Sequence, residues 1–166
     1  FKLQGKWYVY RNNGLQNQSV LYQMDSPTAD ASKQRVWLDP NKLSTDGTVA
    51  LKGTHFSNNG RYMAYVISRS GSDWEEIYVK DCQTGNDLQD HILWAKFTNV
   101  TWLGDGFYYS AYDAPEKGKE TSAKNSVQKI YYHKIGTPQS EDQLFFMNPT
   151  QPLRFYNVDI DHDEKV

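Results

Sequence analysis

The chain has 166 residues, and its 18 basic and 20 acidic side chains leave a net charge of -2. This balance provides no basic face for nucleic acid or for anionic lipid. No apolar run approaches the ~20 residues that a membrane span needs, and no signal-like segment opens the chain, so neither nucleic acid nor a membrane is an expected partner. The cytoplasm and the periplasm are both compatible with this composition.

A single cysteine, Cys82, excludes an internal disulfide and a cysteine-based metal site within the chain. We therefore expect Cys82 to be a small filler beside a turn. Residues 159–164 contain the D-x-D-x-D start of a calcium loop but lack its glycine and its last ligand, so a hairpin turn is the better interpretation. No cofactor and no metal are expected.

The first part of the chain predicts three strands of one antiparallel sheet. Residues 6–11 alternate in the manner of a strand, and residues 20–24 are expected to pair with them across an Asn-Asn-Gly turn. Residues 35–38 form the third strand, which ends before a proline. The first strand of this unit lies upstream or comes from residues 1–3, and residues 39–44 can form one helical turn.

Residues 56–82 carry the clearest pattern of the chain. A tight turn at residues 58–60 precedes the strand 62–67, whose residues are apolar at both alternating sets of positions, as in a strand buried on two faces. A second turn at residues 70–73 leads to the strand 75–80, which has one apolar and one mostly polar side. The segment therefore predicts an antiparallel meander.

Three further segments follow the meander. Residues 87–92 are polar enough to predict a loop, and residues 94–97 predict a strand. Residues 113–128 contain Pro115, Gly118 and several charges, with no apolar period. A connection of this length inside a compact domain is commonly functional or mobile.

The meander recurs along the chain at a spacing of 46 positions in its first part. The corresponding positions are Phe56 with Trp102, Gly60 with Gly106, and residues 76–80 with 129–133. A third copy is predicted to start at residues 157–160. Meanders repeating every 40 to 50 residues, as an approximate period, indicate β-propeller blades.

The predicted fold is therefore all-β: an incomplete fragment, of about three to four blades, of a β-propeller built from four-stranded antiparallel meanders. The approximate blades are residues 1–45, 46–93, 94–148 and the start of the next at 149–166, within a single partial domain 1–166. A β-sandwich with accidental internal similarity is the alternative.

The segments YRNNGLQNQSVLYQMDS, VWLDPNKLSTDGTVALKGTHFSNNGRYMAYVISRSGSDW and ETSAKNSVQKIYYHKIGTPQSEDQLF closely resemble the N-terminal half of the propeller of prolyl oligopeptidases. In these serine peptidases a seven-bladed propeller caps an α/β-hydrolase domain. The resemblance implies that the hydrolase domain of the same polypeptide and short proline-containing peptides are the partners. It also implies a gating, substrate-restricting role.

The resemblance carries over to particular residues. Asp73 and Trp74 match an Asp-Trp pair on the face toward the hydrolase, and Phe97 matches a phenylalanine lining the substrate pocket beyond the proline subsite, here followed by Thr98 instead of Ser. The family's gating loop corresponds to residues 113–128 in a shorter version; its candidate residues are Asp113, Lys117, Lys119, Glu120 and Thr121. Packing between blades would equally account for Trp74 and Phe97, and a mobile connection for the loop.

The residues of α/β-hydrolase catalysis are not found in this sequence. No G-x-S-x-G occurs, so the nucleophile elbow is missing, and no catalytic residue is assigned. The four histidines are scattered, and His55, His91 and His133 flank strands where a hydrogen-bonded surface position is expected. The fragment itself should be inactive.

Two other functions compete with a part of a prolyl oligopeptidase. A free-standing propeller scaffold would bind proteins through loops such as 113–128, and a related exopeptidase would carry insertions that grip a peptide amino terminus, which this sequence does not show. Unpaired strand edges at both ends of an open stack also predict an edge-paired dimer of the fragment.

Overall fold

The computed structural model of this chain describes residues 1–120 and 125–161. Regular structure in this part is dominated by antiparallel strands, which confirms the all-β prediction. Its elements are β1 (Lys2–Leu3), β2 (Lys6–Arg11), β3 (Val20–Met24), η1 (Ala31–Lys33), β4 (Arg35–Leu38), η2 (Pro40–Lys42), β5 (Val49–Phe56), β6 (Tyr62–Arg69), β7 (Glu75–Asp81), β8 (Asp87–Ala95), β9 (Thr101–Leu103), β10 (Gly106–Ala111), β11 (Lys129–Lys134), η3 (Gln139–Glu141) and β12 (Gln143–Met147), where η is a 3-10 helix. None of these helices has the length and hydropathy that crossing a bilayer requires.

Strands β1 to β4 form the first sheet in chain order, as the alternation in residues 6–11, 20–24 and 35–38 predicted. In its central pair Trp7 lies opposite Met24 and Arg11 opposite Val20. The predicted helical turn is η2, which begins after Asp39; the Asp39 carboxylate accepts a hydrogen bond of 3.1 Å from the backbone N–H of Asn41.

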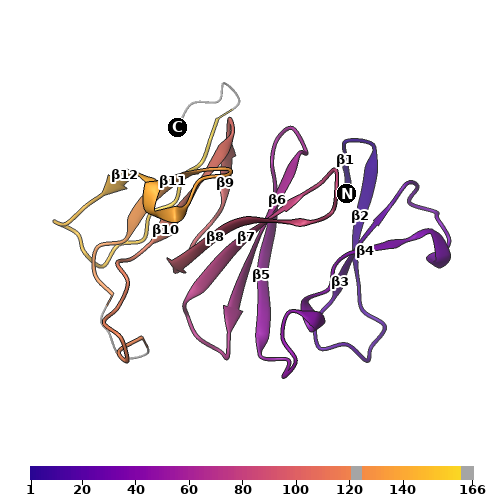
Figure 1. The fold of residues 1–166 in the computed structure, drawn as a ribbon, viewed down its shortest axis with the longest axis horizontal. Helices are drawn as coiled ribbons and strands as arrows, with labels where there is room; N and C mark the ends of the chain where they lie inside the picture. The colour runs from indigo at the N-terminus through magenta and orange to yellow at the C-terminus, as the bar shows by residue number, and fades with distance from the viewer. Residues whose placement is uncertain (121–124, 162–166) are drawn as a thin grey trace.

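The second and third meanders are β5 to β8 and β9 to β12. They are joined by one pairing, between Ala95 at the end of β8 and Ala111 at the end of β10. Figure 1 shows the three groups of strands fanned out side by side. The strands of the second group end at Ala95 and those of the third begin at Thr101; the predicted blade divisions at 45, 93 and 148 stay predictions.

The central strand β6 separates two hydrophobic cores. Its residues Ala64 and Val66 pack in a core that continues into Trp102 and Phe107 of the third meander. The alternate positions on β6 face the opposite way and share a core with the first sheet; the members of this second core are Tyr8, Leu21, Trp37, Leu38, Val49, Met63, Tyr65 and Ile67. A strand buried on two faces is what its two apolar sets predicted. Two cores on either side of one sheet define stacked blades and not a two-sheet sandwich.

The prediction of a loop at residues 87–92 is wrong, because β8 runs through this segment. Its polar side chains find partners on neighbouring strands, which a local pattern cannot reveal. Asp87 accepts a hydrogen bond of 3.1 Å from the Tyr65 hydroxyl and forms an ion pair with Lys80. The predicted strand 94–97 is also wrong in its second half, since β8 ends at Ala95.

Two differences concern the end of the chain. Strand β12 was not predicted. All five of its residues are exposed, so its sequence lacks the alternation of apolar and polar residues that a half-buried strand shows. Residues 157–160, predicted to begin a third copy, form no strand. They run against β9 instead, where the Thr101 hydroxyl donates a hydrogen bond of 2.7 Å to the carbonyl of Val158. The turn predicted at residues 159–164 extends beyond the described residues.

Candidate functional site

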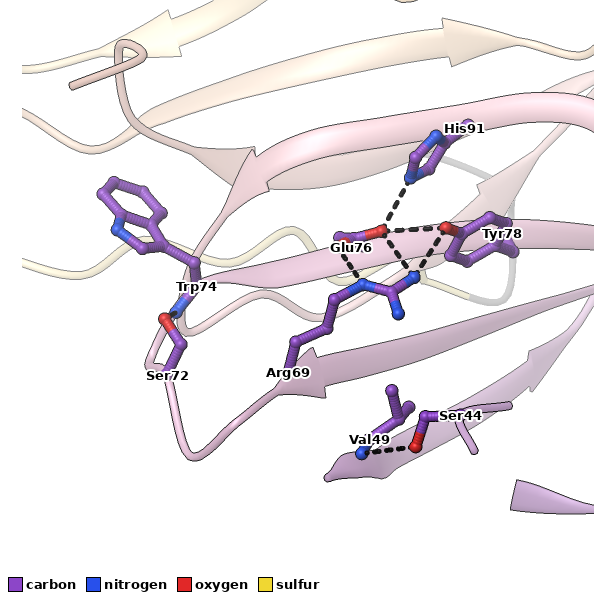
Figure 2. Close-up of polar contacts among 8 residues, drawn as sticks. All are labelled: Ser44, Val49, Arg69, Ser72, Trp74, Glu76, Tyr78 and His91. Atoms are coloured by element: carbon purple, nitrogen blue, oxygen red, sulfur yellow. Dashed lines mark hydrogen bonds and ion pairs between the residues drawn. The ribbon is translucent and has the colours of Figure 1, made fainter. Parts of the chain in front are cut away.

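The predicted residues Asp73, Trp74 and Phe97 lie at the same end of the second meander. Asp73 and Trp74 belong to the hairpin between β6 and β7, and Phe97 follows the end of β8 by two residues. In this hairpin the backbone N–H of Trp74 donates a hydrogen bond of 3.1 Å to the Ser72 hydroxyl (Figure 2). This hydrogen bond stabilises the turn from which the Trp74 side chain projects.

Lys96 brings these three residues together, and sequence reasoning did not single it out. Its ammonium lies 5.0 Å from the centre of the Trp74 ring, 5.6 Å from that of Phe97 and 3.6 Å from the Asp73 carboxylate. We call Asp73, Trp74, Lys96 and Phe97 the Lys96 cluster. In the sequence, only the position of Lys96 beside Phe97 pointed to it. Asp73 and Trp74, which it contacts, lie more than 20 residues away, so no local pattern connects them with Lys96.

The backbone around the Lys96 cluster is unusual. Trp94 has a backbone φ of 62° and Phe97 one of 49°, values that residues other than glycine rarely adopt. The residue after β10 holds the backbone at Trp94 in place: the backbone N–H of Tyr112 donates a hydrogen bond of 3.1 Å to the carbonyl of Trp94. Phe97 follows the end of β8 and is half exposed.

A buried carboxylate supports the segment after Phe97. Glu75, the first residue of β7, accepts a hydrogen bond of 3.0 Å from the backbone N–H of Thr98. Burial raises the pKa of Glu75, while that hydrogen bond and the positive charges of Lys52 and Lys96 act in the opposite direction. The exposed face of Phe97 meets Phe155, with ring centres 4.8 Å apart.

Aromatic rings surround Trp74 on its other sides. The Trp94 ring lies 5.3 Å and the Tyr112 ring 6.4 Å from it, both edge to face. The Asp73 side chain is 74% exposed and projects beside this aromatic group. Trp74 and Trp94 are half-buried and Tyr112 is buried, so the exposed part of this group is the Asp73 carboxylate beside two partly accessible rings. A charge next to such rings is suited to contact with another protein surface or a peptide.

The predicted gating segment connects β10 to β11, so its lack of strand pattern is confirmed for residues 113–120 and 125–128. The indole N–H of Trp74 donates a hydrogen bond of 2.6 Å to the carbonyl of Glu120, and Asp113 forms an ion pair with Lys129. Lys117 and Lys119 are exposed. Thr121, the remaining candidate, lies outside the described residues.

The prediction of a surface position for His133 is wrong. Its side chain is fully buried, with ring nitrogens 2.7 Å from Asp142 and 2.9 Å from Asp90. Burial alone would lower the pKa of His133, but the hydrogen bonds and charges of the two carboxylates outweigh it and raise the pKa to about 9. The protonated ring therefore links β11 to Asp90 on β8 and to Asp142, and it is shielded from solvent.

His91 lies in a second polar network across β6, β7 and β8. Its ring nitrogen is 2.8 Å from the Glu76 carboxylate, which also forms an ion pair with Arg69 at 2.7 Å (Figure 2). The Tyr78 hydroxyl donates to the same carboxylate at 2.8 Å. In Figure 2 the Trp74 ring points away from this network. The Glu76 carboxylate thus has three partners within the sheet, and we interpret this network as stabilising the fold.

Within the described part of the chain, no group of three or more His, Cys, Asp or Glu residues is placed to hold a metal ion. Burial raises the pKa of the Cys82 thiol to about 12, so the thiolate that would act as a nucleophile is disfavoured. The Lys96 cluster places charged groups beside aromatic rings, an arrangement suited to binding.

Three meanders that share cores pairwise define part of a β-propeller domain. The whole chain, residues 1–166, matches the family model described as "Prolyl oligopeptidase, N-terminal beta-propeller domain". The chain belongs to the prolyl oligopeptidase family. The resemblance seen in the sequence is thereby confirmed.

Relatives support the same assignment. The chain is 42% identical over 163 residues to the prolyl endopeptidase of Elizabethkingia meningoseptica, covering 97% of this chain and 23% of the relative. It is 37% identical to prolyl oligopeptidase A of Galerina marginata, covering 95% of this chain and 25% of the relative. A solved structure of prolyl oligopeptidase B from Galerina marginata, bound to a 35mer substrate, matches with a TM-score of 0.87 at 32% identity, covering 97% of this chain and 24% of that one.

The chain thus spans about a quarter of the length of the relatives that it matches. In those relatives the corresponding region is a propeller at the N-terminal side of a larger peptidase.

Proposed function

We propose that this chain is the propeller portion of a serine peptidase that cleaves short peptides after proline. The observation that carries the proposal is the match of residues 1–166 to the propeller domain of this family, with 42% identity to a prolyl endopeptidase. The propeller would restrict entry to short peptides, because a folded protein cannot pass a narrow channel. The α/β-hydrolase domain of the same polypeptide would supply the catalytic serine.

Asp73 and Trp74 would contact the hydrolase domain, with Asp73 pairing with an arginine there. Exposure supports this assignment, since the Asp73 side chain is 74% exposed and its bond to Lys96 is long at 3.6 Å. A long ion pair with an exposed carboxylate is weak and can be replaced by a better partner.

Phe97 would line the substrate pocket beyond the proline subsite. Phe97 is 49% exposed and the neighbouring Phe155 is 60% exposed, so two rings in contact offer apolar surface at the same place. Such a surface can bind an apolar side chain of a peptide.

Residues 113–128 would form the gate, with Asp113, Lys117, Lys119, Glu120 and Thr121 as candidate contacts. The exposure of Lys117 and Lys119 supports this role. Asp113 and Glu120 are attached by single polar contacts, with Lys129 and Trp74, whereas Val127 and Gln128 anchor the end of the segment.

The fragment taken alone would pair through its edge strands. In β12 the residues Leu144, Phe145, Phe146 and Met147 are all exposed, and β11 is its one neighbour in the sheet of the described residues. An apolar strand edge with free backbone groups favours pairing with a second copy.

The test of the proposal uses the isolated chain and the full-length protein side by side. We expect the full-length protein to cleave a Gly-Pro reporter peptide and to react with a serine-directed fluorophosphonate, and the isolated chain to do neither. The gene beyond Val166 should encode further blades and then a G-x-S-x-G elbow. A stop codon after ring closure would support the scaffold instead, and fluorophosphonate labelling of the isolated chain would overturn the claim that it is non-catalytic.

A further inference from the structure

Lys96 has an unusual environment for a lysine at the end of a sheet. Its side chain is only 11% exposed, although among the described residues no ion pair at ordinary hydrogen-bond distance holds it, because the Asp73 carboxylate is 3.6 Å away. The ammonium instead lies over two aromatic rings, Trp74 at 5.0 Å and Phe97 at 5.6 Å. A cation facing two rings is attracted by the negative face of each, and this attraction grows when water is excluded.

The backbone of Lys96 is also anchored. Its carbonyl accepts a hydrogen bond of 3.0 Å from the side-chain amide of Gln128, which is fully buried. The carbonyl oxygen of that same amide accepts a hydrogen bond of 2.6 Å from the backbone N–H of Tyr156. Gln128 thereby ties Lys96 to the end of the predicted gating segment and to the chain that carries Phe155.

Phe97 is held between two fixed neighbours. Lys96 precedes it with both its backbone and its ammonium engaged, and Thr98 follows it with its N–H bonded to the buried Glu75. Phe97 itself adopts φ 49°, a conformation that costs energy and persists where the surroundings determine it. The orientation of the exposed Phe97 ring therefore depends on Lys96.

We propose that Lys96 is a positioning residue for substrate binding: its ammonium, placed between Trp74 and Phe97, holds the Phe97 ring in the orientation that receives a peptide side chain. This inference rests on the proposed function, in which Phe97 lines the pocket beyond the proline subsite. In this proposal Lys96 does not contact the substrate. Its positive charge shapes the pocket by orienting the Phe97 ring.

The test measures kcat and KM of the full-length protein with two reporter peptides. One carries proline alone ahead of the reporter, and the other carries two more residues ahead of proline and so reaches the pocket. We expect Lys96→Met to raise KM about 5-fold for the longer peptide, with kcat unchanged and the shorter peptide unaffected. Lys96→Arg, which keeps the charge and stacks on rings, should restore KM to within about 2-fold of the original.

Lys80→Met is the matched control, because the Lys80 side chain is similarly buried, at 10% exposure, and its ammonium lies 6.0 Å from the centre of the Trp37 ring, outside the proposed pocket. It should leave the ratio of the two KM values unchanged. Equal losses on both peptides, or no change in Lys96→Met, would overturn the inference. If Lys96→Met does not fold, Lys96→Gln is judged by the same criterion.

Phe97→Ala separates this inference from the proposed function. If Phe97→Ala leaves binding of the longer peptide unchanged, Phe97 is not part of the pocket and the proposed function of this site fails. If Phe97→Ala weakens the longer peptide but Lys96→Met does not, only the positioning role of Lys96 fails.

Discussion

The indole N–H of Trp74 donates a hydrogen bond of 2.6 Å to the carbonyl of Glu120, 46 residues away in sequence. The hairpin between β6 and β7 thus holds the connection between β10 and β11. Because both are at the end of the molecule that carries the Lys96 cluster, a change in one is expected to reach the other.

We first predict that Trp74→Phe loosens this connection. Phenylalanine keeps an aromatic ring but lacks the N–H donor, and loss of one neutral hydrogen bond of ~1 kcal/mol raises the open population about 5-fold. Trypsin should therefore cut after the exposed Lys117 or Lys119 about 5-fold faster, as followed by mass spectrometry.

Trp102→Phe is the control for Trp74→Phe. It also removes an indole donor, but here the bond of 2.9 Å is to the carbonyl of His55 and not to the connection. Equal acceleration in both variants would mean general destabilisation and would contradict a specific role for Trp74.

The second prediction concerns His133, which is buried between Asp90 and Asp142. Replacing it with leucine leaves two buried carboxylates without their shared cation, and breaking a buried pair costs about 3–5 kcal/mol. Urea denaturation should show this loss for His133→Leu. Lys134→Ala, at the next and exposed position of β11, should change stability little; similar losses in both would refute the assignment.

The third prediction is the pH dependence of this cluster. The folded pKa of His133 is raised from 6.5 to about 9, so its stabilisation is complete below pH 6.5 and is lost as pH rises through 9. For Asp90, burial alone raises the pKa, but hydrogen bonds from His133 and the N–H of Gly136 lower it below 3.8. Its contribution is therefore lost as pH falls below that value.

Stability measured against pH should thus decline on the alkaline side between pH 6.5 and 9, and the decline should be smaller in His133→Leu. An alkaline decline of the same size in both proteins would show that another group causes it.

The fourth prediction compares two strand glycines. A Cβ at Gly106 would lie 2.1 Å from the carbonyl oxygen of His133, which is backbone and cannot move away, so Gly106→Ala should cost at least ~1–3 kcal/mol. A Cβ at Gly53 would lie 3.1 Å from the His55 ring, which can turn aside. Thermal denaturation should therefore show little change for Gly53→Ala, and equal effects would contradict the difference.

The fifth prediction tests edge pairing of the isolated chain. Analytical ultracentrifugation should detect dimers or larger species, and Leu144→Lys on β12 should shift them toward monomer because a charged edge resists pairing. Leu15→Lys is the control, since Leu15 is 90% exposed but lies in a turn. A monodisperse monomer of the unmodified chain would contradict the proposal.

The sequence by itself determined the meander, its turns and the repeat of the unit. These features depend on neighbours along the chain: Gly60 permits the positive φ of its turn, and the two apolar sets of β6 follow from alternation. The resemblance of the same segments to one family also identified Asp73, Trp74 and Phe97 as candidates.

Only the tertiary structure showed that β8 is a strand, that His133 is buried and that Lys96 joins the candidate residues. Polar residues of β8 resemble a loop until their partners on β6, β7 and β11 are known, and His133 resembles a surface residue until Asp90 and Asp142 surround it. The physical reason is that burial and pairing of polar groups depend on strands distant in sequence, and no local pattern records those contacts.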